Sequence, residues 1–83
     1  MNEKMLKTLI DAAAVKRARI IANGSRFHIE VDAPGKTFCI ETGKGAVRTW
    51  SSIDAAAKWL RGLGIGHAGL ELANWAPGQK SLL

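Results

Sequence analysis

Apolar residues near the start of the chain recur at the spacing of an α-helix. Between Glu3 and Val15 they fall on one face, while polar residues lie largely elsewhere; the apolar positions are Leu6, Leu9, Ile10, Ala13 and Ala14. Asn2 can cap the first turn, and Glu3 favours the positive end of the helix dipole. We therefore predict an amphipathic helix from Glu3 to about Val15.

From residue 17 the pattern changes to the alternation that is typical of strands. Asn23-Gly24 is a strong hairpin signal, because a type I′ turn needs positive φ at both central residues. A loop of these two residues pairs Ala22 with Ser25. It also sets apolar residues opposite each other on one face, as Ile20–Phe27 and Ala18–Ile29. On the other face it pairs Arg19–His28 and Arg17–Glu30, so that a cation meets an anion.

Two further reversals extend the predicted sheet. Ala33-Pro34-Gly35-Lys36 suits a tight turn and keeps apolar residues on the same face, through the pairs Val31–Phe38 and Ile29–Ile40. Gly43-Lys44-Gly45 allows two loop placements, and the preferred one, Lys44-Gly45, pairs Glu41 with Arg48. Both placements put the same four residues on the core face: Phe38, Ile40, Val47 and Thr49. The expected result is a four-stranded antiparallel meander with one apolar face.

A second helix is expected after the meander, with Ser51 as its N-cap and Asp54 closing a capping box. Its buried stripe consists of Ile53, Ala56, Ala57 and Leu60. Gly62 or Gly64 ends it, and a last strand follows from about His67 to Ala73. The order α-β-β-β-β-α-β predicts an α+β two-layer sandwich, with both helices on the apolar face of the sheet. The direction in which the last strand pairs stays open.

Composition limits the class of protein. The chain has 83 residues, 47% of them hydrophobic, and a formal net charge of +5. This length predicts one domain over residues 1–75, with an irregular C-terminal tail over 76–83. No stretch approaches the ~20 apolar residues of a membrane span, and the N-terminal pattern is not that of a signal peptide. The single cysteine, Cys39, excludes an internal disulfide and indicates a reducing, cytoplasmic setting.

The face of the sheet that no helix covers is the first candidate site. It would carry Arg17, Arg19, Arg26, His28, Glu30, Thr37, Cys39, Glu41, Arg48 and Trp50. Basic side chains on a twisted sheet can contact phosphates, and the candidates for nucleic-acid binding are Lys16, Arg17, Arg19, Arg26 and Arg48. The alternative is a solvated face on which the arginines pair with Glu30 and Glu41.

No catalytic, cofactor or metal signature accompanies these residues. His28, Glu30, Cys39 and Glu41 share the open face, but their spacing matches no zinc pattern and the arginines would oppose a cation. Ser51 and Ser52 are better explained as helix caps than as nucleophiles. The glycines of Gly62–Gly66 follow a helix rather than open one, as a phosphate-binding loop would. We expect a protein that is not an enzyme.

Three tryptophans in so short a chain suggest an interface. Trp59 is expected on the flank of its helix, Trp50 on the open face and Trp75 beside the tail. Tryptophan is enriched at interfaces, and small domains often complete their cores by dimerising. The alternative is that Trp59 and Trp75 pack on each other or cover the edge of the core.

The second half of the chain resembles a known family. The run from Arg48 to Ile65, RTWSSIDAAAKWLRGLGI, and the run from Asn74 to Lys80, NWAPGQK, are similar to small ParC-like partition-associated proteins. Those proteins are encoded on plasmids and integrative conjugative elements, and are unrelated to the topoisomerase subunit of the same name. The opening KTLI and AVKR segments are also similar, so the resemblance spans nearly the whole chain.

The resemblance implies an accessory role in maintaining a mobile genetic element. Its partner would be DNA or a partition protein, and the motifs carry no established functional residue. Two alternatives remain. One is a homodimeric protein–protein interaction module without DNA binding. The other is a sheet that reads DNA like the arm-binding domains of phage and transposon integrases, against which the extra helix, the final strand, Glu30 and Glu41 all count.

Overall fold

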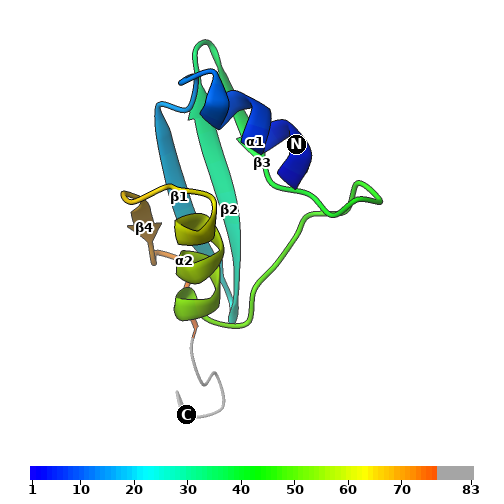
Figure 1. The fold of residues 1–83 in the computed structure, drawn as a ribbon. Helices are drawn as coiled ribbons and strands as arrows, with labels where there is room; N and C mark the ends of the chain where they lie inside the picture. Colours follow the sequence, from blue (N-terminus) through cyan, green and yellow to red (C-terminus); the bar gives the residue numbers. More distant parts are fainter. Residues whose placement is uncertain (77–83) are drawn as a thin grey trace.

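The structure is a computed structural model that describes residues 1–76 of the chain, and it has the expected two layers (Figure 1). Two helices, α1 (Glu3–Asp11) and α2 (Ile53–Gly62), lie against the same face of one sheet. The α+β class and the placement of both helices are therefore confirmed. Residues 77–83 of the predicted tail lie outside the described residues.

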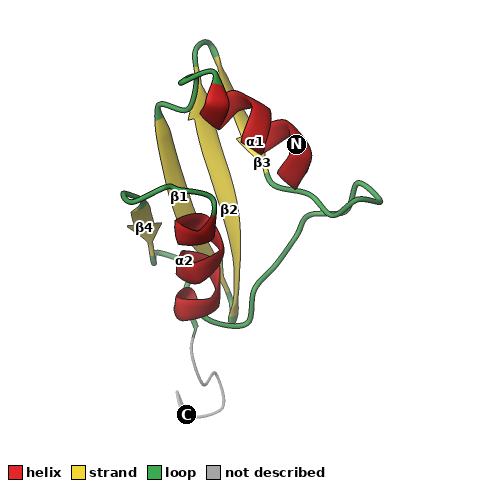
Figure 2. Cartoon of the chain, in the orientation of Figure 1, coloured by secondary structure: helices red, strands yellow, loops and turns green. Residues whose placement is uncertain are grey.

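The sheet has four strands in the order β3-β2-β1-β4 (Figure 2). Antiparallel pairing joins β1 (Arg17–Asn23), β2 (Arg26–Ala33) and β3 (Lys36–Cys39). The last strand, β4 (Gly69–Glu71), runs parallel to β1 at the sheet edge. The antiparallel part is thus a meander of three strands, not four. The pairing that the sequence left open is parallel.

The second hairpin has the predicted register, and the first is shifted. Val31 pairs with Phe38 across β2 and β3, as expected, and Gly35 has a φ of +74° in the turn. In the first hairpin Asn23 pairs with Arg26, so Gly24 and Ser25 form the loop and the predicted register is wrong by two residues. Gly24 has a φ of +67°, and a glycine at the first central position is the requirement of a type II′ turn. A shift of two preserves the face of every side chain.

The chain leaves the sheet after Ile40 and returns at Trp50. Backbone hydrogen bonds join Trp50 to Phe27 on β2, at 2.8 and 2.9 Å. Within the excursion Glu41 bridges Val47 and Thr42 bonds to Ala46, so the loop is Gly43–Gly45 and neither expected placement is correct. This excursion projects away from the two layers in Figure 1.

The excursion inverts the faces predicted for its residues. Trp50 is only 8% exposed and belongs to the core, so its expected place on the open face is wrong. Val47 is exposed, and Val47 and Thr49 line a hollow beside His28 and Cys39 instead of facing the core. The alternation rule fails here because residues 41–49 do not form a continuous strand.

The first helix begins at a side-chain cap and ends just before a residue in the left-handed region. Asn2 caps α1 by accepting from the Met5 N–H at 2.9 Å, as predicted. The helix stops at Asp11, earlier than expected, and Ala13 lies in the left-handed region at a φ of +55°. Ala13 and Ala14 then donate to the carbonyls of Ile10 and Leu9, which is the hydrogen-bond pattern of a Schellman motif.

The N-cap of α2 is Ser52, not Ser51. Its side chain accepts from the Ala55 N–H at 3.1 Å, so Asp54 closes no capping box and instead pairs with Lys58. The same C-terminal motif ends this helix, with Gly64 at a φ of +93°. Between the layers lies the buried core, which consists of Leu6, Ala18, Ile20, Ala22, Phe27, Ile29, Val31, Ile40, Trp50, Ala56 and Leu60.

Candidate interaction surfaces

Arg19 on the open face is surrounded by carboxylates. Its guanidinium nitrogens lie 3.1 Å from Glu30, 3.0 Å from Asp32 and 3.0 Å from Glu71. These partners come from the neighbouring strands β2 and β4, so the sheet itself assembles the cluster. The Arg19 side chain is only 17% exposed. Three carboxylates around one cation make this part of the open face acidic, not basic.

The ionisation of this cluster follows from its contacts. The hydrogen bond that Arg19 donates to Glu71, with the nearby charge of Asp32, raises the pKa of Arg19 above its usual value. The hydroxyl of Thr37, which donates to Asp32 at 2.8 Å, lowers the pKa of that carboxyl, and Arg19 lowers it further. Both shifts keep the charged forms in place. Arg19 therefore links β1 to the strands on both sides of it. Its terminal guanidinium nitrogens are occupied by carboxylates and are not free to contact a phosphate.

Arg48 packs against two tryptophan rings that also contact each other. Its guanidinium carbon lies 5.1 Å from the centroid of Trp50 and 5.0 Å from that of Trp59, and the two rings are 5.1 Å apart. Glu3 on α1 accepts from Arg48 at 3.4 Å and from the Trp59 indole N–H at 3.2 Å. That indole hydrogen bond, followed by Lys7, lowers the pKa of Glu3. This group, the Arg48 cluster, joins α1, α2 and the excursion.

Trp59 and Trp75 agree with one half of the alternative given for them, because they do not pack on each other but each lies against a residue of the core. Trp59 is half-buried against Trp50, and Trp75 lies 6.2 Å from Phe27, so Trp59 and Trp75 do not cover each other. Trp75 is 39% exposed and pairs with Gly24 beside the end of β1. Of the three tryptophans expected at an interface, Trp75 is the one with a large exposed surface.

The remaining basic candidates separate into two places. Lys16 and Arg17 line a hollow at the start of β1, and the Arg17 side chain is 65% exposed although it lies 3.7 Å from Asp32. Arg26 sits at the opposite end of the sheet and donates to Thr49. The five residues predicted to contact phosphates therefore do not form one continuous basic surface.

His28, Glu30 and Cys39 lie close together on the open face of the sheet. His28 Nε2 lies 3.1 Å from Glu30, and burial, with Glu30 and Glu41 nearby, raises the pKa of the Cys39 thiol. Such a thiol is less nucleophilic than an exposed one. Within residues 1–76, no three His, Cys, Asp or Glu side chains come close enough to hold a metal. No helix of this part of the chain is long and apolar enough to cross a membrane.

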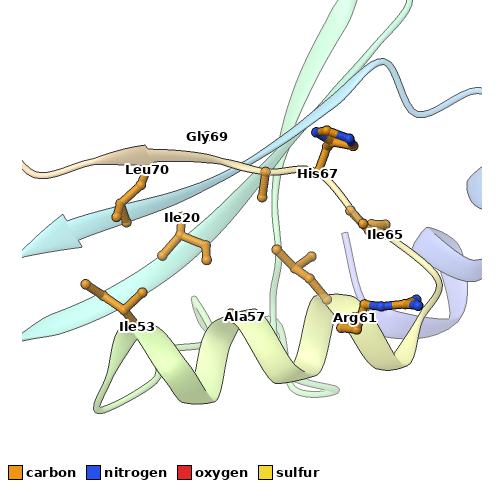
Figure 3. A pocket seen from close by; sticks show the side chains of 11 residues that line it. Ile20, Ile53, Ala57, Arg61, Ile65, His67, Gly69 and Leu70 are labelled. Carbon is orange, nitrogen blue, oxygen red and sulfur yellow. The ribbon is translucent and has the colours of Figure 1, made fainter.

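A groove between α2 and β4 is a surface that the sequence reasoning missed (Figure 3). It has a volume of about 360 Å³, and its apolar walls include Ile20, Ile53 and Leu70. Figure 3 shows these three side chains turned toward one another between the helix and the strand. The groove exists because α2 packs over β1 and β2, while β4 extends the sheet beyond the helix.

One end of the groove is basic. Arg61, from the last turn of α2, lines it, and so does the loop before β4, where His67 turns its ring away from α2 (Figure 3). No Asp or Glu is among the described residues that line the groove, and no carboxylate of residues 1–76 lies within salt-bridge distance of Arg61. In the sequence, the one indication that Arg61 has no acidic partner is that Ala57, four residues earlier on the same helix, is not acidic. The parallel pairing of β4, which brings His67 beside this helix end, has no local signal.

The comparisons with known proteins give one result. The profile of the ParC-like family matches residues 1–79. Neither the curated proteins nor the solved structures include a significant match. The match covers nearly the whole chain, including both helices and all four strands of the sheet, and it agrees with the resemblance in the second helix. The protein belongs to the ParC-like family.

Proposed function

We propose that this protein is a non-enzymatic accessory protein of a mobile genetic element that assists DNA partition or maintenance by binding a partition protein. The observation that carries the protein partner is the exposed apolar segment that begins in β4. Leu70, Leu72 and Trp75 are 46%, 40% and 39% exposed within six residues of one another. Apolar residues gathered on one exposed segment favour a protein-binding surface over a nucleic-acid surface.

The contacts that two of the arginines already make within the fold support a protein partner over DNA. Arg19 contacts three carboxylates, and Arg48 stacks on two tryptophans. A phosphate would have to compete with these contacts, and the carboxylates around Arg19 would repel it. Two of the five expected phosphate-binding residues are thereby better explained as structural.

The test is a direct binding measurement with purified proteins. The full chain is titrated by calorimetry with each partition protein encoded on the same mobile element. We expect a saturable complex with one of them. We expect it to weaken at least tenfold for the Leu72→Ser, Trp75→Ser double variant. Met5→Ser is the matched control, because Met5 is a 52% exposed apolar residue on α1. No complex with any of these proteins, or equal binding by the double variant, contradicts the proposal.

DNA binding is the second candidate, and the exposed pair Lys16 and Arg17 favours it. A labelled generic duplex is titrated by fluorescence anisotropy at about 50 and about 200 mM salt. Micromolar binding that collapses with salt, and that Lys16→Gln with Arg17→Gln weakens, would establish a phosphate-contacting surface. No binding at the lower salt concentration would remove DNA as a partner of this chain.

A further inference from the structure

We propose that the groove between α2 and β4 binds the C-terminal segment of a partner protein, which adds to β4 as an extended strand and places its terminal carboxylate beside Arg61 and His67. This inference rests on the proposed function, since it names the surface and the chemistry of a protein partner. Three features of the groove carry it: its apolar walls, the free edge of β4 and the basic end.

The walls suit apolar side chains presented in a row. The groove has a volume of about 360 Å³, at the small end of the roughly 300–1,000 Å³ typical of ligand sites. Leu70 projects from β4 toward α2, as Figure 3 shows. In a strand added beside β4, every second side chain would project toward the same layer. Those side chains would enter the groove, and the intervening ones would face solvent.

The rim of the groove is an unpaired strand edge. Among the described strands, β4 is the last in the order of the sheet and pairs with β1 on one side only. All three of its residues are exposed. An exposed edge is a template for another chain, and main-chain hydrogen bonds to such an edge are a common way to bind extended peptides.

The basic end supplies donors for a carboxylate. The Arg61 guanidinium has no carboxylate of residues 1–76 within 4.0 Å, whereas His67 turns its ring away from α2 in Figure 3 and can offer only its backbone N–H to the groove. The backbone N–H groups of Gly66 and His67 donate to no other residue in this part of the chain. A cluster of free main-chain and side-chain donors at the end of an apolar groove is suited to capture a terminal carboxylate.

The position of the basic end fixes the direction of the bound segment. His67 precedes β4 in the chain, so Arg61 and His67 lie at the N-terminal end of this strand. A segment that adds antiparallel to β4 finishes at that end and brings its C-terminal carboxylate there. A parallel segment would bring its N-terminal ammonium to Arg61, and the two cations would repel each other.

The experiment selects peptides and then tests their terminus. A library of randomised hexapeptides with free C-termini is selected on the immobilised full chain. The selected peptides are resynthesised as acids and as amides and titrated by fluorescence anisotropy. We expect alternating apolar residues in the selected peptides and binding at least tenfold tighter for the acid than for the amide. Arg61→Gln should abolish that preference, and Leu70→Ser should weaken both forms.

Lys58→Gln is the matched control, because Lys58 is an exposed cation on the same helix that does not line the groove. Each variant is used only if its circular dichroism spectrum and melting temperature match those of the unchanged chain. The inference is overturned if no peptide is selected, if acid and amide bind equally, or if Arg61→Gln keeps the preference. Self-association that the selected peptide does not displace would also overturn it, since a second copy would then fill the groove.

These outcomes separate the inference from the proposed function. If a partition protein binds and the Arg61→Gln and Leu70→Ser variants bind it equally well, the function stands and the groove is wrong. If peptides are selected with the expected terminus but no partition protein binds, the groove stands and the partner is wrong.

Discussion

Replacing Arg48 with alanine should destabilise the fold rather than impair nucleic-acid binding. Each cation–π contact contributes about 0.5–1 kcal/mol at an exposed site and about 2 kcal/mol when desolvated. The Arg48 side chain is 36% exposed, so we take about 1 kcal/mol for each ring and about 2 kcal/mol for the pair. The hydrogen bond to Glu3 adds little, because both side chains are solvated. For a domain of this size the loss lowers the melting temperature by about 8–16 °C.

Thermal unfolding followed by circular dichroism measures this effect. The control is Lys44→Ala, in the same excursion, which should change stability by less than about 0.5 kcal/mol. Combining Arg48→Ala with Trp59→Leu should give a coupling energy of about 1 kcal/mol, since one of the two contacts is shared. A melting temperature within about 2 °C of the unchanged chain would refute the reasoning. It would return Arg48 to the candidates for phosphate binding, where only the DNA affinity should fall.

Three further predictions follow from local geometry. Ala13→Gly should raise the free energy of unfolding by about 0.5–1 kcal/mol by relieving a left-handed alanine, and Gly64→Ala should lower it by about 1 kcal/mol; denaturant titration measures both. The pKa values of Asp32 and Glu3 are lowered in the folded state, so the folded state binds fewer protons than the unfolded state. Stability should therefore be retained above about pH 5 and fall as the pH drops through about 4. A melting temperature that stays constant over this range would contradict the prediction. The raised pKa of Cys39 should make its alkylation by iodoacetamide at about pH 8 slower than that of a free thiol, and a rate equal to that of glutathione would refute this.

The layers of the fold could be predicted from the sequence because they depend on periodicity. The alternation in β1 and β2 and the helical spacing in α1 and α2 assign most side chains to a face, although Ala57, expected in the buried stripe of α2, is exposed. Even the wrong hairpin register kept those faces, since the two registers differ by two residues. Contacts outside the hairpin turn select the observed register. That register places Arg19 opposite Glu30 and beside Glu71, which lies 52 positions further along the chain.

The errors lie where the chain stops being periodic. Trp50 was misplaced because residues 41–49 leave the sheet, and a side chain's face cannot be counted through a loop. Ser51 and Ser52 are equivalent as caps by composition, and only the tertiary path selects Ser52. The groove could not be predicted because it arises from the parallel pairing of β4 with a strand about 50 residues away.

The weak attachment of β4 has a dynamic consequence. Only three residues pair it to β1, and all three are exposed, so separating it from the sheet costs less free energy than unfolding the core. The amide protons of Leu70 and Glu71 should therefore exchange with solvent faster than those of Ile20 and Ile29. β4, which forms one wall of the groove, is therefore the part of the sheet that separates most readily. A chain that binds in the groove would have to hold β4 in place against β1.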